Sequence, residues 1–311
     1  VKGNIVGGSY VASGAITFDD AALVSKASFD GNSVTLTTTT GNIELVGVKA
    51  NDDATLTSAA DIKGSTVIAD NGEASLTAAD AIRDTGVTAG TTIATSGDII
   101  ASTLSAAGNI TISNAALADS VTAVSSGGAI TANDNVDEIK GGEYTASGAV
   151  TLGSDADKLT NLVNATITAG SLTAHVSNDM TGVLARIDGQ ADLNIGRILG
   201  ASNLTVGDTL NITGTDDADT QLANNIIGTV GAITATNIGD AVNNIVTTGA
   251  KLDLTVADNV VGGEYVAGGA IDVDAALVSK ASFDGDSVEL TTTTGNIELV
   301  QVKANDGATL T

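Results

Sequence analysis

The chain has 311 residues, and its 37 acidic against 12 basic side chains give a formal net charge of −25. This charge argues against a nucleic-acid-binding protein, which needs a basic face, and against binding to anionic membranes. Cysteine is absent, which excludes a disulfide framework and cysteine-ligated zinc, and no apolar run approaches the ~20 residues that a membrane-spanning helix needs.

The apolar residues are small. Hydrophobic residues make up 42% of the chain but aromatic residues only 2%, so a core must be built from Ala, Val, Ile and Leu. Such side chains fill little space, and the core is therefore expected to be thin. Proline is absent, as expected where nearly every residue lies in or beside a strand, because proline removes a ladder hydrogen bond.

A short apolar–polar alternation recurs along the whole chain, most plainly at 108–113, which reads Gly-Asn-Ile-Thr-Ile-Ser. Alternation with period two predicts a strand with one buried face. Recurrence at a step of about twenty residues predicts a solenoid in which each turn is one layer. Taken in chain order, the turns are expected to begin near Gly14, Asn32, Asn51, Asp70, Gly90, Gly108, Gly127, Gly148, Gly170, Gln190, Asp208, Val230, Ala250, Gly269, Asp286 and Asn305.

The expected fold is therefore all-β: a single-stranded parallel β-helix, or β-solenoid, of about 15 turns of roughly 17–22 residues. Each turn should hold three strands. The last strand ends in an apolar-x-Ala motif, such as Val67-Ile68-Ala69. The first strand should point two residues inward, in columns that include Val34, Ala54, Ala74, Leu172, Leu193 and Leu210 beside Leu36, Leu56, Leu76, Ala174, Ile195 and Ile212; the middle strand should be marked by Ile62, Ile99, Leu117, Ile139, Leu159 and Ile198.

The three tyrosines share one register. Tyr10, Tyr144 and Tyr265 occupy inward positions of last strands, and phenylalanine follows one turn later at Phe29 and Phe283. Aromatic rings prefer packed contact, so we expect Tyr10 to stack on Phe29 and Tyr265 on Phe283 in the core. A ladder of exposed rings that binds a ligand is the alternative.

A longer repeat is superimposed on the turns. Residues 21–31 return unchanged as 275–285, and 36–46 return as 290–300, an offset of 254 residues. This predicts one continuous β-helix over 1–311, in which 7–260 form one long block and 262–311 begin the next. We expect the array to extend along its axis, by covalent continuation or by head-to-tail docking of another copy.

Candidate sites are few. Asp52 and Asp53 form one acidic pair, and Asp216 and Asp217 form another beside Asp219. These aspartates are candidate calcium ligands, although calcium needs several converging oxygens and acidic corners are usually solvated turns. Calcium is the one cofactor considered.

No enzyme is expected. The single histidine, His175, has no cysteine or second histidine to complete a catalytic or metal set, and it is expected to face solvent. The repeated turns are expected to offer no distinguished groove.

Outward threonines form two files on the first strands. The pairs Thr35 and Thr37, then Thr55 and Thr57, begin these files, which give way to Asp253, Asp272 and Glu289 later in the chain. A flat Thr-x-Thr array resembles that of ice-binding β-solenoids, a remote alternative here. Threonine is also simply favoured in strands.

The turns at 90–126 (Gly-Thr-Thr-Ile-Ala-Thr-Ser-Gly-Asp-Ile-Ile and onward) resemble the haemagglutinin-type repeats of filamentous-haemagglutinin-like adhesins, large bacterial exoproteins of two-partner secretion. Other large repetitive prokaryotic surface proteins look similar. The resemblance implies a right-handed parallel β-helix, an extracellular or cell-surface location, and a structural or adhesive role in a fibre. Its partners would be further copies of itself, with cell-surface glycans or other cells as further candidates. A polysaccharide-binding or polysaccharide-cleaving β-helix is the alternative from another class.

Overall fold

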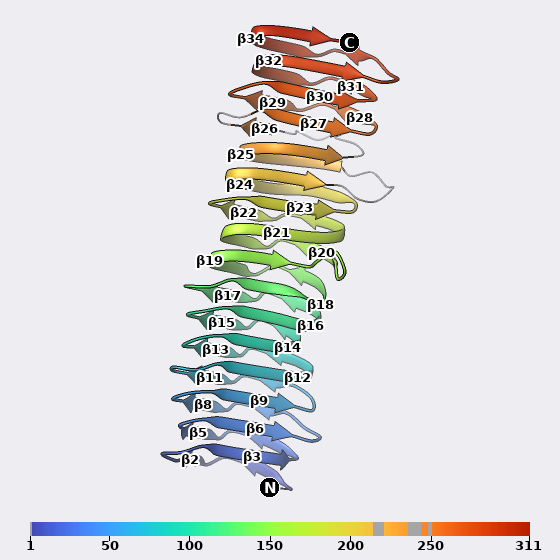
Figure 1. Ribbon diagram of the computed structural model, residues 1–311. Coiled ribbons are helices and arrows are strands. Elements are labelled where there is room, and N and C mark those ends of the chain that lie inside the picture. The colour runs from blue at the N-terminus through green and yellow to red at the C-terminus, as the bar shows by residue number, and fades with distance from the viewer. Residues whose placement is uncertain (1, 214–220, 236–243, 248–250) are drawn as a thin grey trace. The chain divides into compact units, whose positions relative to one another are not determined.

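The computed structural model describes residues 2–213, 221–235, 244–247 and 251–311. Their regular structure consists of β-strands, without a helix, and the strands pair in parallel with their equivalents one turn away (Figure 1). The chain forms two compact units, 1–157 and 158–311. Both are parallel β-solenoids, with about 14 turns in all, which confirms the expected fold class. None of the described residues belongs to a helix that could cross a membrane.

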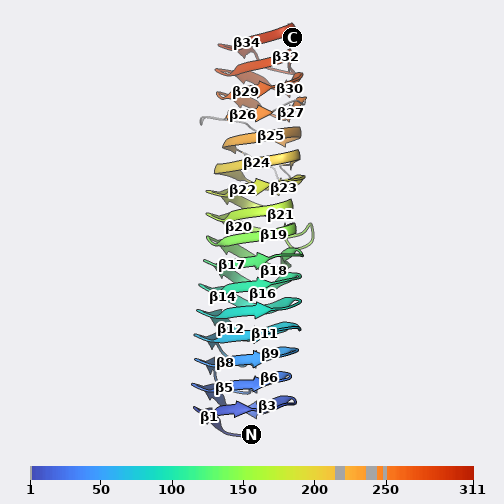
Figure 2. The same ribbon diagram turned by 90° about the vertical axis from the view of Figure 1, so that its left-hand side faces the viewer.

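Each turn of unit 1 carries three strand positions, and successive turns lie one above another in both views (Figure 1, Figure 2). The first position is taken by β3 (Ile16–Ala21), β6 (Val34–Thr38), β9 (Ala54–Ser58) and the openings of β12 (Ala74–Arg83), β14 (Ile93–Ile100), β16 (Ile110–Asp119) and β18 (Ile130–Lys140). The middle position is taken by β1 (Asn4–Val6), β4 (Leu23–Ser25), β7 (Ile43–Glu44), β10 (Ile62–Lys63) and the later parts of β12, β14, β16 and β18. The last position is taken by β2 (Ser9–Val11), β5 (Ser28–Gly31), β8 (Gly47–Ala50), β11 (Thr66–Ala69), β13 (Gly86–Ala89), β15 (Thr103–Ala106), β17 (Thr122–Ser125) and the opening of β19 (Glu143–Leu152), whose end returns to the first position.

The alternation places side chains as the sequence predicts. Leu36, Leu56 and Leu76 align in one column and are fully buried. Thr35 and Thr55, between the inward residues, pair across the turns and are only half-buried. The inward column does contain one exception, which the pattern did not reveal: Thr95 follows Leu76 in register, is buried, and donates its hydroxyl hydrogen bond to the Thr111 carbonyl at 3.2 Å.

The predicted aromatic stacks are confirmed. In unit 1 the rings of Tyr10 and Phe29 lie 5.1 Å apart and 9° from parallel. Phe18, which the sequence did not single out, meets both rings edge-on. In unit 2 the rings of Tyr265 and Phe283 lie 4.9 Å apart and 13° from parallel.

Two turns of unit 1 bend between their middle and last strands at a pair of glycines, Gly7-Gly8 and Gly141-Gly142, whereas the others bend there at a single left-handed residue. Its φ is 53° at Leu45, 57° at Gly64, 50° at Asp84, 49° at Ala101 and 55° at Ser120. An L-residue is disfavoured there because its Cβ approaches the following carbonyl oxygen. Most of these single residues are not glycine, so their residue types do not reveal where the corner lies.

Unit 2 repeats the architecture. Its strands are β20 (Leu159–Val163), β21 (Thr166–Thr181), β22 (Leu184–Ile187), β23 (Ala191–Ile195), β24 (Ile198–Thr213), β25 (Gln221–Ala235), β26 (Asn244–Thr247), β27 (Leu252–Val256), β28 (Asn259–Val261), β29 (Glu264–Ala267), β30 (Ile271–Ala275), β31 (Leu277–Ser279), β32 (Ser282–Thr292), β33 (Ile297–Glu298) and β34 (Gln301–Leu310).

The register corrects one predicted column. Leu172 pairs with Ala191, which pairs with Leu210, so the expected alignment of Leu172 with Leu193 is wrong by two residues. Leu193 aligns with Ala174 instead. All of these side chains are still buried, because a shift of two residues returns a strand to the same face.

The predicted middle strand is also corrected at two places. Ala118, and not Leu117, is the buried residue that pairs with Ile99. Leu199, and not Ile198, is in register with the buried Met180.

Candidate functional site

One corner of unit 1 is shorter than its neighbours. The corner joins the second inward residue of a first strand to the inward residue of the next middle strand. It spans six positions from Leu76 to Ile82 and six from Ile112 to Ala118, but only four from Thr95 to Ile99. Thr95 and Ile99 remain in register with both flanking turns. The surface loop between them is therefore two residues shorter than the loops of those turns.

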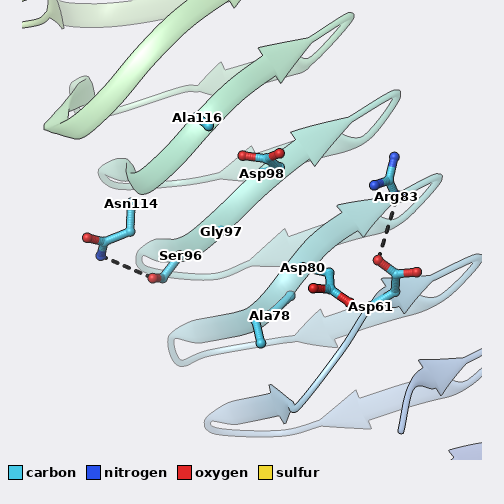
Figure 3. Close-up of a pocket in the computed structure, with 10 residues that line it drawn as sticks. Asp61, Ala78, Asp80, Arg83, Ser96, Gly97, Asp98, Asn114 and Ala116 are labelled. Atoms are coloured by element: carbon cyan, nitrogen blue, oxygen red, sulfur yellow. Dashed lines mark hydrogen bonds and ion pairs between the residues drawn. The ribbon is translucent and has the colours of Figure 1, made fainter.

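The short corner leaves a hollow of about 720 Å³, which we call the notch. Figure 3 shows its side chains on successive turns, with Asp98 between the turn of Asp80 and the turn of Asn114. The notch is lined by Asp61, Ala78, Ala79, Asp80, Arg83, Ser96, Gly97, Asp98, Asn114 and Ala116.

Gly97 forms the floor and is required there. Its φ is +111°, and a Cβ on this residue would lie 2.4 Å from the carbonyl oxygen of Ala78 in the preceding turn. Only glycine tolerates both the dihedral angle and the close approach. The shortened loop therefore lies directly on the backbone of the preceding turn.

Hydrogen bonds orient several of the polar side chains that line the notch. The Leu117 N–H donates to Asp98 Oδ1 at 3.0 Å, and Arg83 Nε lies 3.5 Å from Asp61 Oδ1. Asn114 Nδ2 donates to Ser96 Oγ at 3.2 Å, as drawn in Figure 3. Three aspartates and one arginine give the notch a formal charge of −2.

The acids of the notch, Asp61, Asp80 and Asp98, are not gathered into a cluster. Among the described residues, no group of three or more His, Cys, Asp or Glu side chains is placed to hold a metal ion.

Asp52 and Asp53 lie at another corner and are used within it. Asp52 Oδ2 accepts a hydrogen bond from Asn32 Nδ2 at 2.6 Å, and Asp53 Oδ1 accepts one from the Glu73 N–H at 2.9 Å. Asn51 and Asn71 continue this corner as an amide ladder, with Asn71 Nδ2 donating to Asn51 Oδ1 at 3.2 Å. The other calcium candidates, Asp216, Asp217 and Asp219, lie outside the described residues.

A smaller hollow of about 190 Å³ surrounds His175 on the outer face of the first strands of unit 2. His175 points outward, as expected, but it is half-buried beside Asp192 and Asn194. The Asp192 carboxylate is held by Gln190 Nε2, at 2.8 and 2.9 Å from its two oxygens, and by Asn211 Nδ2 at 2.7 Å.

The expectation that no groove would stand out is wrong. The sequence signal for the notch was a short step between successive turns. Ile93 and its partner Ile110 are 17 residues apart, whereas Val34 and its partner Ala54 are 20 residues apart. A step length alone does not say which corner is shortened, so the notch could not be located before the register was known.

Comparisons with protein-family models, with curated proteins and with solved structures each find no match to this chain. The chain is therefore assigned to a fold, a parallel β-solenoid of repeating turns, and not to a family.

Proposed function

We propose that this chain is a structural segment of a β-helical fibre at a cell surface, with an adhesive role. The observation that carries the proposal is the recurrence of one stacking geometry. Tyr10 on Phe29 and Tyr265 on Phe283 repeat within a few tenths of an ångström and a few degrees. In a solenoid each turn contacts only its neighbours, so repeated blocks lengthen the body without requiring a new core.

Differences between the two copies of the block support a structural role. Ser9, Thr17 and Thr35 become Glu264, Asp272 and Glu289 in the second copy. All three replaced residues point outward from their strands. The buried residues around them are nearly unchanged, which is expected where stacking is retained and only the surface varies.

The acidic surface fits a long body that stays separate from its neighbours. Like charges oppose sideways association, whereas contact along the axis proceeds through backbone hydrogen bonds and inward apolar side chains. The partner along the axis is a further copy of the block, joined covalently or docked head-to-tail. Such a contact is heterologous and does not close into a ring.

An extracellular location and an adhesive role are supported by the resemblance of 90–126 to adhesin repeats.

Microscopy of native material tests the fibre. We expect thin filaments in negative stain, and a mass per length of about 0.4 kDa per Å, which follows from 30.4 kDa over 311 residues and roughly 20 residues per 4.8 Å layer. X-ray diffraction from aligned filaments should place the 4.8 Å reflection along the fibre axis. Discrete particles of one size, or a 4.8 Å spacing across the axis, would contradict the proposal.

A further inference from the structure

The notch interrupts a surface that otherwise repeats from turn to turn. The corner of β14 is the shortest of its kind in unit 1, and it produces the hollow between the corners of β12 and β16 (Figure 3). We propose that the notch binds a neutral oligosaccharide, held by Asp80, Asp98 and Asn114 with the Arg83 guanidinium at one end. This inference does not depend on the proposed fibre.

The dimensions suit an elongated ligand. A volume of about 720 Å³ lies within the usual range of small-molecule sites, roughly 300–1,000 Å³. The walls belong to turns two layers apart, and two layers span about 9.6 Å. A chain of a few sugar rings fits a hollow of this volume, and its open mouth lets the remainder of a polysaccharide extend into solvent.

The chemistry of the walls suits hydroxyl groups. A sugar hydroxyl donates one hydrogen bond and accepts others, so it is best met by a carboxylate beside an amide or a guanidinium. Asp98 is oriented by the Leu117 N–H at 3.0 Å on Oδ1, and Asn114 is fixed by Ser96 at 3.2 Å. Hydrogen bonds to charged groups are the stronger kind. The methyl groups of Ala79 and Ala116, which are both exposed, are available to the C–H faces of the rings.

Charge selects among the possible ligands. The notch has a formal charge of −2 and the chain −25, so sulfated or uronate sugars are repelled. A metal ion is a poor occupant, because the described acids do not form a metal-holding group. Asp61 already forms an ion pair with Arg83 at 3.5 Å. Its negative charge is therefore partly neutralised and attracts an organic cation less strongly. A neutral polyhydroxyl ligand fits the remaining groups.

Binding is tested on the full chain by saturation-transfer NMR and titration calorimetry. The probes are the neutral trisaccharides cellotriose, maltotriose, mannotriose and triacetylchitotriose, with trigalacturonate as the acidic probe and spermidine as the cationic probe. We expect at least one neutral trisaccharide to bind, and neither charged probe to do so.

Two pairs of variants locate the site. Ala116→Trp fills the notch from an exposed position and should abolish binding, whereas Ala107→Trp, at an exposed position just after β15 and away from the notch, should leave binding unchanged. Asp98→Asn should weaken binding about tenfold through the loss of a charged acceptor. Its control, Asp70→Asn, removes the same charge at a distant corner and should have no effect. Thermal unfolding confirms that each variant is folded.

The proposal is overturned if no neutral trisaccharide binds, or if binding persists in Ala116→Trp. It is also overturned if spermidine or trigalacturonate binds in an Ala116-dependent manner, because the notch would then select a charged ligand.

Discussion

The Ser102 hydroxyl accepts a hydrogen bond at 3.2 Å from the N–H of Thr85, which lies one turn earlier. The same hydroxyl donates a hydrogen bond to the Ile100 carbonyl at 3.0 Å. Both side chains are buried. Ser65 makes the same contact with the Val46 N–H at 3.3 Å. In each case the donor follows a left-handed corner residue, where the regular strand ladder is interrupted. A buried hydroxyl from the next turn satisfies the backbone amide there.

Ser102→Ala should therefore lower the free energy of unfolding by about 1–2 kcal/mol, because it leaves the buried Thr85 N–H without its acceptor. The control is Ser105→Ala, a half-buried outward position on the strand that follows, β15, which should change stability by less than about 0.5 kcal/mol. Urea unfolding followed by circular dichroism measures both. Equal losses in the two variants would show that the hydroxyl contact has no special role.

Ala101→Gly should stabilise the protein. Ala101 has φ 49°, a conformation that costs an L-residue about 1–2 kcal/mol. Glycine removes this strain from the folded state. Its greater freedom in the unfolded chain offsets only part of the resulting stabilisation. We expect a net increase of about 0.5–1 kcal/mol in urea unfolding. Ala94→Gly, in the extended part of β14, should instead destabilise by about 0.5–1 kcal/mol. A loss at both positions would contradict the argument.

Tyr144 and Tyr265 should respond differently to removal of their hydroxyl groups. The buried Tyr144 hydroxyl has no hydrogen-bond partner within the described parts of the chain, whereas Tyr265 donates to the Gly262 carbonyl at 3.2 Å. Tyr144→Phe should raise stability by about 1 kcal/mol, and Tyr265→Phe should lower it by a similar amount. Thermal unfolding midpoints of the two variants should move in opposite directions.

The same hydroxyl predicts a pH dependence. Burial, and secondarily the nearby Asp119 charge, raises the pKa of Tyr144 well above its ordinary value. Above about pH 10 the unfolded chain loses this proton while the folded chain keeps it, so the folded state binds more protons and its stability falls as pH rises. Tyr144→Phe should make the decline between about pH 10 and 12 shallower. An unchanged slope would place the ionising group elsewhere.

Glu289→Thr should stabilise unit 2. Asp253, Asp272 and Glu289 stand in register on successive strands, and Lys251 contacts the first two, at 3.2 and 2.9 Å. Like charges directly opposite each other destabilise a sheet, and threonine is the residue of the first copy at Thr35. We expect a gain of a few tenths to about 1 kcal/mol at low salt, shrinking in 1 M NaCl, where the screening length is about 3 Å. A gain that salt does not change would point to strand propensity instead.

The repeat in the sequence was enough to predict the solenoid, the inward and outward faces, and the two aromatic stacks. Period-two alternation is a local property that survives errors of register. Leu172, for example, was assigned the wrong partner and is buried nonetheless, because the shift was two residues. Ala118 shows the limit: beside Leu117 it is the less apolar choice, and only pairing with Ile99 identifies it as the inward residue.

The fold class and the orientation of most strand residues follow from the amino-acid pattern alone, because they depend on neighbours two residues and one turn away. The positions of the bends and of the hollow on the surface become visible only when the turns are stacked. The left-handed conformation of Ala101 is imposed by the stacked turns and not by its own preference. The notch exists because Thr95 and Ile99 keep their register while the loop between them is two residues shorter than the loops on either side, and such a difference becomes a cavity only when the turns are stacked.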